Sequence, residues 1–447
     1  NTNLDERMKW IFASKGGRVF GLVWSGQLVS NLGSSMTQFG LAVWVFQETG
    51  SATQLALIVL AARLPMLLVS PFVGALVDRW DRRWAMVLAD SGAAIGTLVT
   101  AILFATGSLE IWHLYLTLSF SGLFQAFQFP AYSAATTLLI PKERYTNASG
   151  MVQLAGSAGS IIAPPIAAVV VVALGPGVLF AADFATFLFA VSTLLFVRFP
   201  KVESSGAPGR GVRSLLTEAR AGLDFVLDRR ALLILMVSFV VVNFAFAFQS
   251  VLLIPLLLTL TTAEAAGTVV SAGAVALMVG SLGLSVLGGP RNRLAGVYLP
   301  IAAMGAGLVV IGASTTVWLV AAGLMFMMGT HPIAGGSSQS IWQSKVPPDL
   351  QGRVFAIRQV SGLAASPIAF LVAGTLADRV FEPMMSDPGG MLAAILGSGP
   401  GRGFGLMFLL SGVMAIVTAM VGFRHPRLRR LDEEIPDLDL VPEPGPA

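Results

Sequence analysis

The chain of 447 residues contains no cysteine, and its three histidines, His113, His331 and His425, lie far apart. Without cysteine, disulfides, thiolate catalysis and cysteine metal sites are excluded. The scattered histidines do not predict a metal centre. A phosphate-binding loop of the form G-x-x-x-x-G-K-[ST] is also missing. We therefore expect no metal site, no cofactor and no ATP hydrolysis.

Charged residues are scarce as well, at 12% of the chain, whereas soluble proteins contain about 25%. Apolar residues make up 55% and form twelve long segments. A bilayer core about 30 Å thick needs roughly 20 apolar residues per helix, and helices satisfy the backbone of such uninterrupted runs in lipid. We predict an all-α membrane protein with twelve transmembrane helices, at residues 19–47, 53–77, 84–106, 112–139, 146–173, 178–198, 230–259, 265–288, 294–313, 317–345, 354–378 and 403–423.

The basic residues gather in alternate loops of this predicted topology. Of the 28 Lys and Arg residues, 24 lie in the two termini and in the loops that share their side of the membrane. Because cytoplasmic loops retain positive charge, we expect a multi-pass protein of the cell membrane with both termini in the cytoplasm. This distribution leaves no separate basic face, so we expect no nucleic-acid binding.

The predicted helices fall into two halves that look related. The sequence Ile140-Pro141-Lys142-Glu143 recurs as Val346-Pro347-Pro348-Asp349 after the tenth segment. Two similar six-helix bundles predict a substrate site at their interface, and a pathway that closes within one chain predicts a monomer. The expected parts are an N-terminal bundle at 1–198, a cytoplasmic linker at 199–229, a C-terminal bundle at 230–423 and a disordered tail at 424–447. The linker pattern predicts an amphipathic helix, either on the membrane surface or as a tether.

The turn after the second segment reads GALVDRWDRR from Gly74 to Arg83. It resembles the loop signature G-x-L-x-D-R-x-G-R-R of the major facilitator superfamily, with Asp81 at the usual glycine position. The resemblance covers nearly the full chain and implies transport by alternating access. Asp78 can accept from the N–H groups that begin the eleventh helix, and Arg82 can pair with Glu143. We expect a cytoplasmic latch formed by Gly74, Asp78, Arg79, Arg82, Arg83 and Glu143; the alternative is that the arginines only set the topology.

The fifth segment carries Gly150-(x8)-Gly159-(x3)-Ala163-Pro164. This pattern resembles the antiporter signature of the same superfamily, with alanine at three glycine positions, and families that bear it are mostly exporters. Residues 129–150 are similar to the drug:proton antiporter branch that contains macrolide exporters, although siderophore exporters and lysophospholipid carriers share much of the pattern. Small residues predict close packing against the eighth segment, at Gly280, Gly283 and Ser285, and ordinary helix packing is the alternative reading.

Polar side chains form stripes on the helices that line the pathway in this fold. On the first segment they recur at steps of four, three and four, which places them on one face. Interhelical hydrogen bonding is the alternative to a role in the cavity. The predicted substrate cavity contains Gln27, Asn31, Gln38, Phe124, Gln128, Asn243, Gln249 and Trp342.

Ionisable residues inside the membrane are costly and are therefore functional candidates. Arg63 and Arg358 are the predicted buried charges, and the candidates for proton coupling are Asp183, Asp90 and His331. We expect Asp183 near the outer face, and Asp90 and Arg358 near the cytoplasmic ends, where an ion pair or the latch is the alternative role. A histidine can exchange protons near neutral pH, but His331 precedes Pro332, so a helix break there is the alternative.

These features predict a secondary transporter that exports amphiphilic small molecules, such as drugs or macrolide-like compounds, by proton antiport. The alternative is a lysophospholipid or siderophore carrier of the same fold, without proton coupling. Its expected partners are a small-molecule substrate, protons and the lipid bilayer. A receptor or a membrane-embedded enzyme is a weaker alternative, and we do not expect an enzyme.

Overall fold

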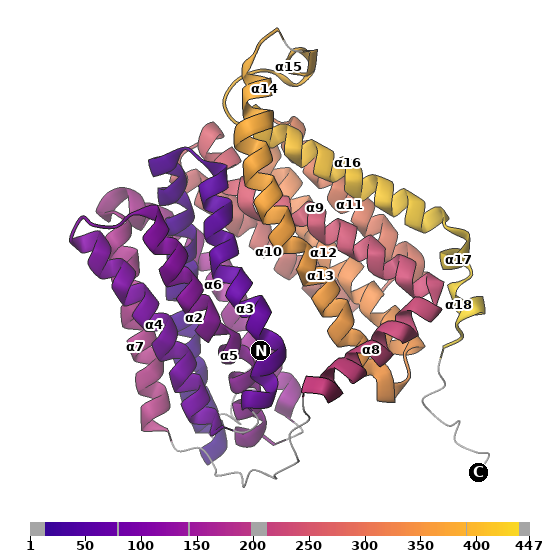
Figure 1. The fold of residues 1–447 in the computed structure, drawn as a ribbon, viewed down its shortest axis with the longest axis horizontal. Helices are drawn as coiled ribbons and strands as arrows, with labels where there is room; N and C mark the ends of the chain where they lie inside the picture. Colours follow the sequence, from indigo (N-terminus) through magenta and orange to yellow (C-terminus); the bar gives the residue numbers. More distant parts are fainter. Residues whose placement is uncertain (1–13, 78–79, 142–143, 198–211, 390, 438–447) are drawn as a thin grey trace. The chain divides into compact units, whose positions relative to one another are not determined.

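A computed structural model of the protein describes residues 14–77, 80–141, 144–197, 212–389 and 391–437. These residues form helices and loops, and no strand occurs among them (Figure 1). Twelve long helices correspond to the twelve predicted segments, which confirms the all-α membrane architecture. They are α2 (Lys15–Thr49), α3 (Ala52–Val77), α4 (Arg82–Ala105), α5 (Ile111–Leu139), α6 (Tyr145–Leu174), α7 (Pro176–Phe196), α9 (Arg230–Leu260), α10 (Ala263–Leu287), α11 (Arg293–Ala313), α12 (Val317–Lys345), α13 (Pro348–Leu376) and α16 (Arg402–Arg424).

Within the described ranges, ten helices are both long enough and apolar enough to cross a membrane. The two long helices outside this group are α2 and α5, which have 35 and 29 residues. Their length suffices to cross a bilayer, but Gln27, Asn31 and Gln38 on α2 and Gln125 and Gln128 on α5 lower their apolarity. Among the described residues, these two helices with polar stripes therefore lack the membrane-length apolar window that the other ten contain.

Two compact units make up the fold, and each is described by itself. The first comprises residues 1–209 with 261–271, and the second comprises residues 210–260 with 272–447. The division falls inside the linker predicted at 199–229. It differs from the predicted domains in one respect, because the start of α10 groups with the first unit.

Glycines at a spacing of seven residues place α2 directly on α7 in the first unit. A Cβ atom at Gly26, Gly33 or Gly40 would lie 2.1 to 2.4 Å from a side chain of α7. Small residues of this kind allow close approach between helices in lipid, where packing replaces the hydrophobic effect as the driving force. The approach brings the polar side chains of α2 within reach of α7.

In the second unit, α11 and α16 meet through paired glycines. Gly305 faces Gly412, and Gly312 faces Gly405, so that a Cβ atom on any of the four would lie 2.3 to 2.7 Å from the opposite carbonyl oxygen. The two backbones therefore touch, and no larger residue fits at these positions without separating the helices.

The amphipathic helix predicted in the linker is α8 (Val212–Asp228). Phe225 and Val226 are buried, and a Cβ atom at Gly222 would lie 3.0 Å from the backbone of Arg353 on α13. The helix thus packs on the second unit near the start of α13. This arrangement favours the tether over a helix that lies on the membrane surface.

The chain after α16 differs from the predicted disordered tail. Two short helices follow, α17 (Pro426–Arg429) and α18 (Leu431–Glu434), and each buries a leucine, Leu428 and Leu431. Upstream, α13 continues through the π-helix η2 (Ala377–Phe381) into α14 (Glu382–Ser386), and α15 (Met391–Leu396) follows. The predicted tail residues 438–447 lie outside the described ranges.

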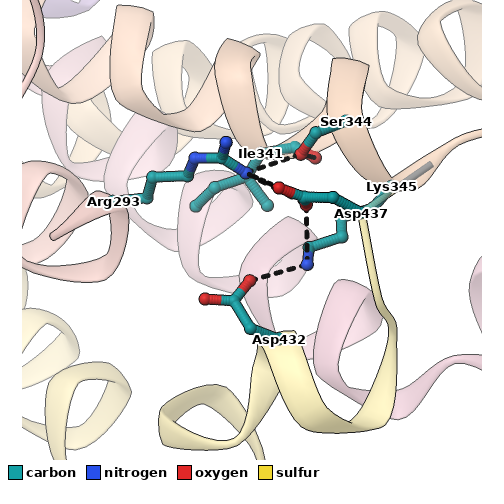
Figure 2. A network of polar contacts seen from close by, with 6 residues as sticks. All are labelled: Arg293, Ile341, Ser344, Lys345, Asp432 and Asp437. Carbon is teal, nitrogen blue, oxygen red and sulfur yellow. Dashed lines mark hydrogen bonds and ion pairs between the residues drawn. The ribbon is translucent and has the colours of Figure 1, made fainter. Parts of the chain in front are cut away.

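An ion-pair network holds this tail at the ends of α11 and α12 (Figure 2). The ammonium of Lys345 lies 2.6 Å from Asp432 and 2.8 Å from Asp437, and Arg293 lies 2.9 Å from Asp437. Partial burial acts to raise the pKa of Asp437, but hydrogen bonds from Lys345 and Ser344 and the charges of Lys345 and Arg293 outweigh it, so this pKa lies below its ordinary value. The side chain of Lys345 is 1% exposed, so the ammonium needs these partners.

Candidate functional site

Asp90 on α4 lies at the centre of a buried polar cluster in the first unit. One carboxylate oxygen accepts from the amide of Gln27 on α2 at 2.8 Å, and the other accepts from the amide of Gln128 on α5 at 3.0 Å. Gln128 also donates to the carbonyl oxygen of Gln27 at 3.0 Å. Asp90 is 1% exposed, and no cationic side chain of the described residues lies within ion-pair distance. The cluster therefore joins three helices around a carboxyl group that has only neutral partners.

This cluster changes the interpretation of two predicted cavity residues. Gln27 is buried, and both glutamines form hydrogen bonds between helices, as the alternative reading expected. As for the alternative roles of Asp90, its hydrogen-bond partners in the described part of the chain are amides and not cations. A role in the latch stays a prediction, because Asp78, Arg79 and Glu143 lie outside the described residues. The polar stripes of α2 and α5 thus face the carboxylate of Asp90 on α4. The pattern of neither stripe predicts this partner.

Asp183 on α7 forms a second buried group. Its carboxylate accepts from Ser34 on α2 at 3.0 Å and from Thr97 on α4 at 3.4 Å, and it is 3% exposed. Ser34 lies near the middle of α2, which runs from Lys15 to Thr49, so Asp183 lies deeper than the outer face where we expected it. Again, its hydrogen-bond partners are neutral.

The two carboxyl groups lie at different levels of the same bundle. On α2, Gln27 and Ser34 are seven residues apart, and on α4, Asp90 and Thr97 are also seven residues apart. Seven residues correspond to two helical turns, or about 10 Å along the axis. Each level thus takes one residue from α2 and one from α4, and Asp90 and Asp183 are separated by about two turns.

Hydroxyl groups continue this polar track away from Asp90. Thr100 on α4 donates to Thr117 on α5 at 3.0 Å, and Ser121 donates to the carbonyl oxygen of Ala93. A small cavity of about 20 Å³ beside them is lined in part by Thr97, Thr100 and Thr117. A single water molecule needs about 10–15 Å³ of such space. The track therefore reaches from Asp183 toward the end of α4 through groups that can exchange hydrogen bonds.

A larger pocket of about 450 Å³ lies within the second unit, between α9, α12 and α13. It contains two of the predicted cavity residues, Asn243 and Trp342, together with the predicted buried charge Arg358. The guanidinium of Arg358 donates to Gln339 at 2.6 Å and to Ser338 at 3.1 Å. This is the size of a pocket for a small molecule or for the head of a larger one.

The other predicted cavity residues are spread over three helices. On α2, Asn31 is half-buried and Gln38 is exposed. Phe124 is half-buried on α5, and its ring lies tilted against that of Phe120 with ring centroids 4.9 Å apart. Gln249 is half-buried on α9 but does not line the 450 Å³ pocket. For these four residues, substrate contact stays a prediction.

Two candidate residues in the membrane segments are exposed. Arg63, predicted as a buried charge, is exposed on α3, because it shares a helix face with the exposed residues Met66 and Ser70. His331 is exposed on α12, and α12 runs through Pro332 without a break. The helix-break alternative for His331 is therefore wrong, while its role in proton coupling stays a prediction.

Part of the predicted latch lies in α3 and α4. Gly74 belongs to α3, whereas Asp78, Arg79 and Glu143 fall outside the described residues, so the pairing of Arg82 with Glu143 stays a prediction. Arg83 donates to the carbonyl oxygens of Leu194 and Leu195 at 2.8 and 2.5 Å. These carbonyls end α7, where a positive charge is favourable.

Asp81, which departs from the superfamily pattern, has a structural role. Its carboxylate accepts from the backbone N–H groups of Arg83 at 2.9 Å and Trp84 at 3.3 Å. It is the N-cap of α4, and aspartate is among the preferred residues there. A cap signal could have been recognised in the sequence, because Asp81 is an aspartate three residues before the apolar run that begins at Trp84.

The antiporter-like segment of α6 packs through small residues. A Cβ atom at Gly159 would lie 2.8 Å from the hydroxyl of Ser35 on α2, and Ala163 is buried. The carbonyl oxygen of Pro164 lies 2.7 Å from the Cβ position of Gly267 on α10. Gly150 has open space around its Cβ position. Within the first unit, the partner of this segment on α10 is thus Gly267. Gly280 lies in the second unit, where it meets Gly329 on α12, and its packing against α6 stays a prediction.

Comparisons with known proteins agree with this architecture. The Major Facilitator Superfamily profile matches residues 23–370. The chain is 27% identical over 427 residues to Macrolide efflux protein A of Streptococcus pyogenes, covering 92% of this chain and 97% of that protein. It is 26% identical to Multidrug efflux pump Tap of Mycolicibacterium fortuitum, covering 92% of this chain and 96% of the pump.

Among solved structures, the fold is similar to a bacterial homologue of the human lysosomal transporter Spinster in an inward-facing and unoccupied conformation. The TM-score is 0.71 with 15% sequence identity, and the match covers 94% of this chain and 99% of the other. This likeness concerns the fold alone. With the profile spanning most of the helices, the chain belongs to the Major Facilitator Superfamily, a family of membrane transporters and not of enzymes.

Proposed function

We propose that this transporter exports amphiphilic small molecules by proton antiport with alternating access. The observation that carries the proposal is the buried carboxyl group of Asp90, which is held by the amides of Gln27 and Gln128 and has no cationic partner among the described residues. Similarity to macrolide and multidrug efflux proteins supports the class of cargo. Asp183, whose partners Ser34 and Thr97 are also neutral, is the second carboxyl group of this proposal, and His331 stays a further candidate.

A carboxyl group in this setting is suited to exchange a proton. An ionised carboxylate inside a membrane protein is costly without a counter-charge, and a protonated one is neutral. Protonation breaks no ion pair, because both partners are amides that can also accept a hydrogen bond after reorientation. The charge state of Asp90 would thus alter the contacts between α2, α4 and α5.

Coupling requires that the proton favour one conformation over the other. A bound proton shifts the equilibrium only by its differential affinity for the two states. Because Asp90 links three helices, a rearrangement of these helices changes its partners and hence its proton affinity. Asp183, about two turns away, would receive the proton first from the outer side, through the hydroxyl groups of α4 and α5.

The proton gradient provides enough energy for export. One charge moved across 100 mV is worth about 2.3 kcal/mol, which corresponds to a concentration ratio of about 50 for the cargo. In this proposal the protein acts as a monomer in the cell membrane, with both termini in the cytoplasm. The latch residues around Asp78 close the cytoplasmic side after the cargo has entered.

Transport into inverted membrane vesicles tests the proposal. Vesicles that contain the protein should accumulate a radiolabelled macrolide when their interior is acidic. The accumulation should disappear when an ionophore removes the pH gradient. Uptake that equilibrates at the same level with and without the gradient would contradict proton antiport and would indicate a facilitated carrier.

A carrier for acidic amphiphiles, such as a lysophospholipid, is the second candidate. The observation that favours it is the guanidinium of Arg358 in the pocket of the second unit. Such a carrier could operate without proton coupling, in which case the vesicle experiment would show uptake that is independent of the gradient.

A further inference from the structure

The pocket between α9, α12 and α13 combines one cationic group with a wall of polar and apolar side chains. Arg358 is half-buried in it, and the neighbouring polar groups are amides and hydroxyls, among them Asn243, Gln339 and Gln359. No carboxylate of the described residues lies within ion-pair distance of Arg358. A cation inside a membrane bundle is costly without an anion. The charge of Arg358 therefore has no counter-charge among the described residues.

The guanidinium is held in position by its surroundings. Two of its five N–H groups donate, to the side-chain oxygen of Gln339 at 2.6 Å and to the hydroxyl of Ser338 at 3.1 Å. The rings of Trp342 and Phe239 lie 5.6 and 5.9 Å from its central carbon, within the range of cation–π attraction. Arg358 is therefore fixed by neutral groups that leave its charge uncompensated.

The remaining donors of Arg358 match an acidic group. Three N–H groups have no partner among the described residues, and a guanidinium presents such donors in a planar fork that suits a carboxylate or a phosphate. Asn243 also lines the pocket. Its side-chain amide donates to a backbone carbonyl of its own helix at 2.8 Å, so its side-chain position is fixed, and it offers a further polar group to a ligand.

Apolar side chains supply the rest of the pocket wall. Met236, Val240 and Phe355 line it together with the aromatic rings. Flexible thioether and aromatic surfaces suit the apolar part of a ligand and tolerate variation in its shape. A volume of about 450 Å³ accommodates a head group with a short part of a tail.

From these contacts we infer that the pocket binds the acidic head group, a carboxylate or a phosphate, of an amphiphilic substrate, and that Arg358 is the residue that selects for it. The inference rests on the second candidate of the proposed function, a carrier for acidic amphiphiles, because it names the head group that this carrier would bind. Its test measures binding alone, so a protein that binds acids but does not move protons would overturn the proposed function and leave this inference intact.

Binding of four octyl compounds to the purified full chain in nanodiscs tests the inference. Octanoate and octyl phosphate carry acidic heads, octanol is neutral, and octyltrimethylammonium is cationic. We expect both acids to bind about ten- to hundredfold more tightly than octanol, as charge-assisted hydrogen bonds contribute in proteins. Arg358→Gln should remove this preference, whereas Arg379→Gln, which removes an exposed arginine after α13, should retain it.

Binding of octanol or octyltrimethylammonium as tight as that of the acids would overturn the inference, and so would an acid preference that persists in Arg358→Gln. If this variant does not fold, Arg358→Lys decides, because it keeps the charge but loses the fork. We then expect severalfold weaker acid binding, and unchanged acid binding would contradict the role of Arg358. Lysophosphatidic acid placed in the nanodisc tests a membrane lipid as the source of the acidic group, and octanoate added to the buffer tests a dissolved acid. If Arg358→Gln weakens the binding of neither compound, the inference is also overturned.

Discussion

The side-chain amide of Gln27 on α2 donates to the carboxylate of Asp90 on α4 across 2.8 Å. Gln128 completes the contact from α5 at 3.0 Å. A buried carboxylate with two amide donors connects three helices, and protonation of it would break no ion pair. This relationship links the packing of the first unit to its proposed mechanism.

Loss of one amide donor should destabilise the first unit. In Gln128→Leu, Asp90 and the carbonyl oxygen of Gln27 both lose a buried hydrogen bond, which costs about 1–3 kcal/mol. The matched control is Gln125→Leu, because Gln125 lies on the same helix and is exposed. We expect a lower melting temperature in detergent for Gln128→Leu only. Equal melting temperatures of the two variants would contradict the structural role of the cluster.

A methyl group between α3 and α5 should separate these helices. A Cβ atom at Gly122 would lie 2.1 Å from the carbonyl oxygen of Ala62, and a backbone atom cannot rotate away. We expect Gly122→Ala to lose about 1–3 kcal/mol, as overpacked sites do. Gly156→Ala is the control, because nothing lies within 4 Å of its Cβ position, and it should melt like the wild type or slightly higher. The packing account fails if Gly122→Ala melts like the control.

Removal of both tail carboxylates should leave the buried ammonium of Lys345 without partners. Asp432 and Asp437 are 82% and 45% exposed, so solvent reduces the cost of breaking this network to about 1–2 kcal/mol. The double variant Asp432→Asn with Asp437→Asn should therefore melt at a lower temperature, and Glu433→Gln, an exposed neighbour, should not. A double variant that is as stable as the wild type would show that the tail network contributes nothing.

The stability provided by Asp437 should depend on pH. Its folded-state pKa lies below the ordinary value of 3.8. A group with a lowered pKa stabilises the protein above its unfolded-state pKa, and this contribution disappears as the pH falls through the folded-state pKa. The difference in melting temperature between wild type and Asp437→Asn should thus be constant above about pH 5 and should shrink below it. A difference that grows on acidification would have the wrong sign.

The helices could be predicted from the sequence because lipid permits few alternatives. A run of apolar residues such as 230–259 must form a helix, and the structure begins and ends α9 within a residue of these bounds. The glycines at a spacing of seven on α2 were a further signal, since they mark the face that meets α7. Pairs of side chains within one helix follow from periodicity alone.

Contacts between helices require rotations and registers that periodicity does not provide. Arg63 and Arg358 are both arginines within apolar segments, yet one is exposed and the other lines a pocket. Periodicity predicts the correct face for Gln27, but not its partner Asp90 on α4. The register of α4 depends on Gly92 and Gly96, where this helix closely approaches α5. The tail at Asp437 looked disordered because its partner, Lys345, is 92 residues away.

The most direct test measures proton movement in proteoliposomes that contain the purified protein. An imposed gradient of the exported compound should drive protons in the opposite direction, as reported by a pH-sensitive dye. In Asp90→Asn, and in Asp183→Asn if both groups carry the proton, this flux should vanish while exchange of the compound across the membrane continues. Proton flux that is unchanged in both variants, or absent in a wild type that still exchanges the compound, would contradict proton antiport through these carboxyl groups.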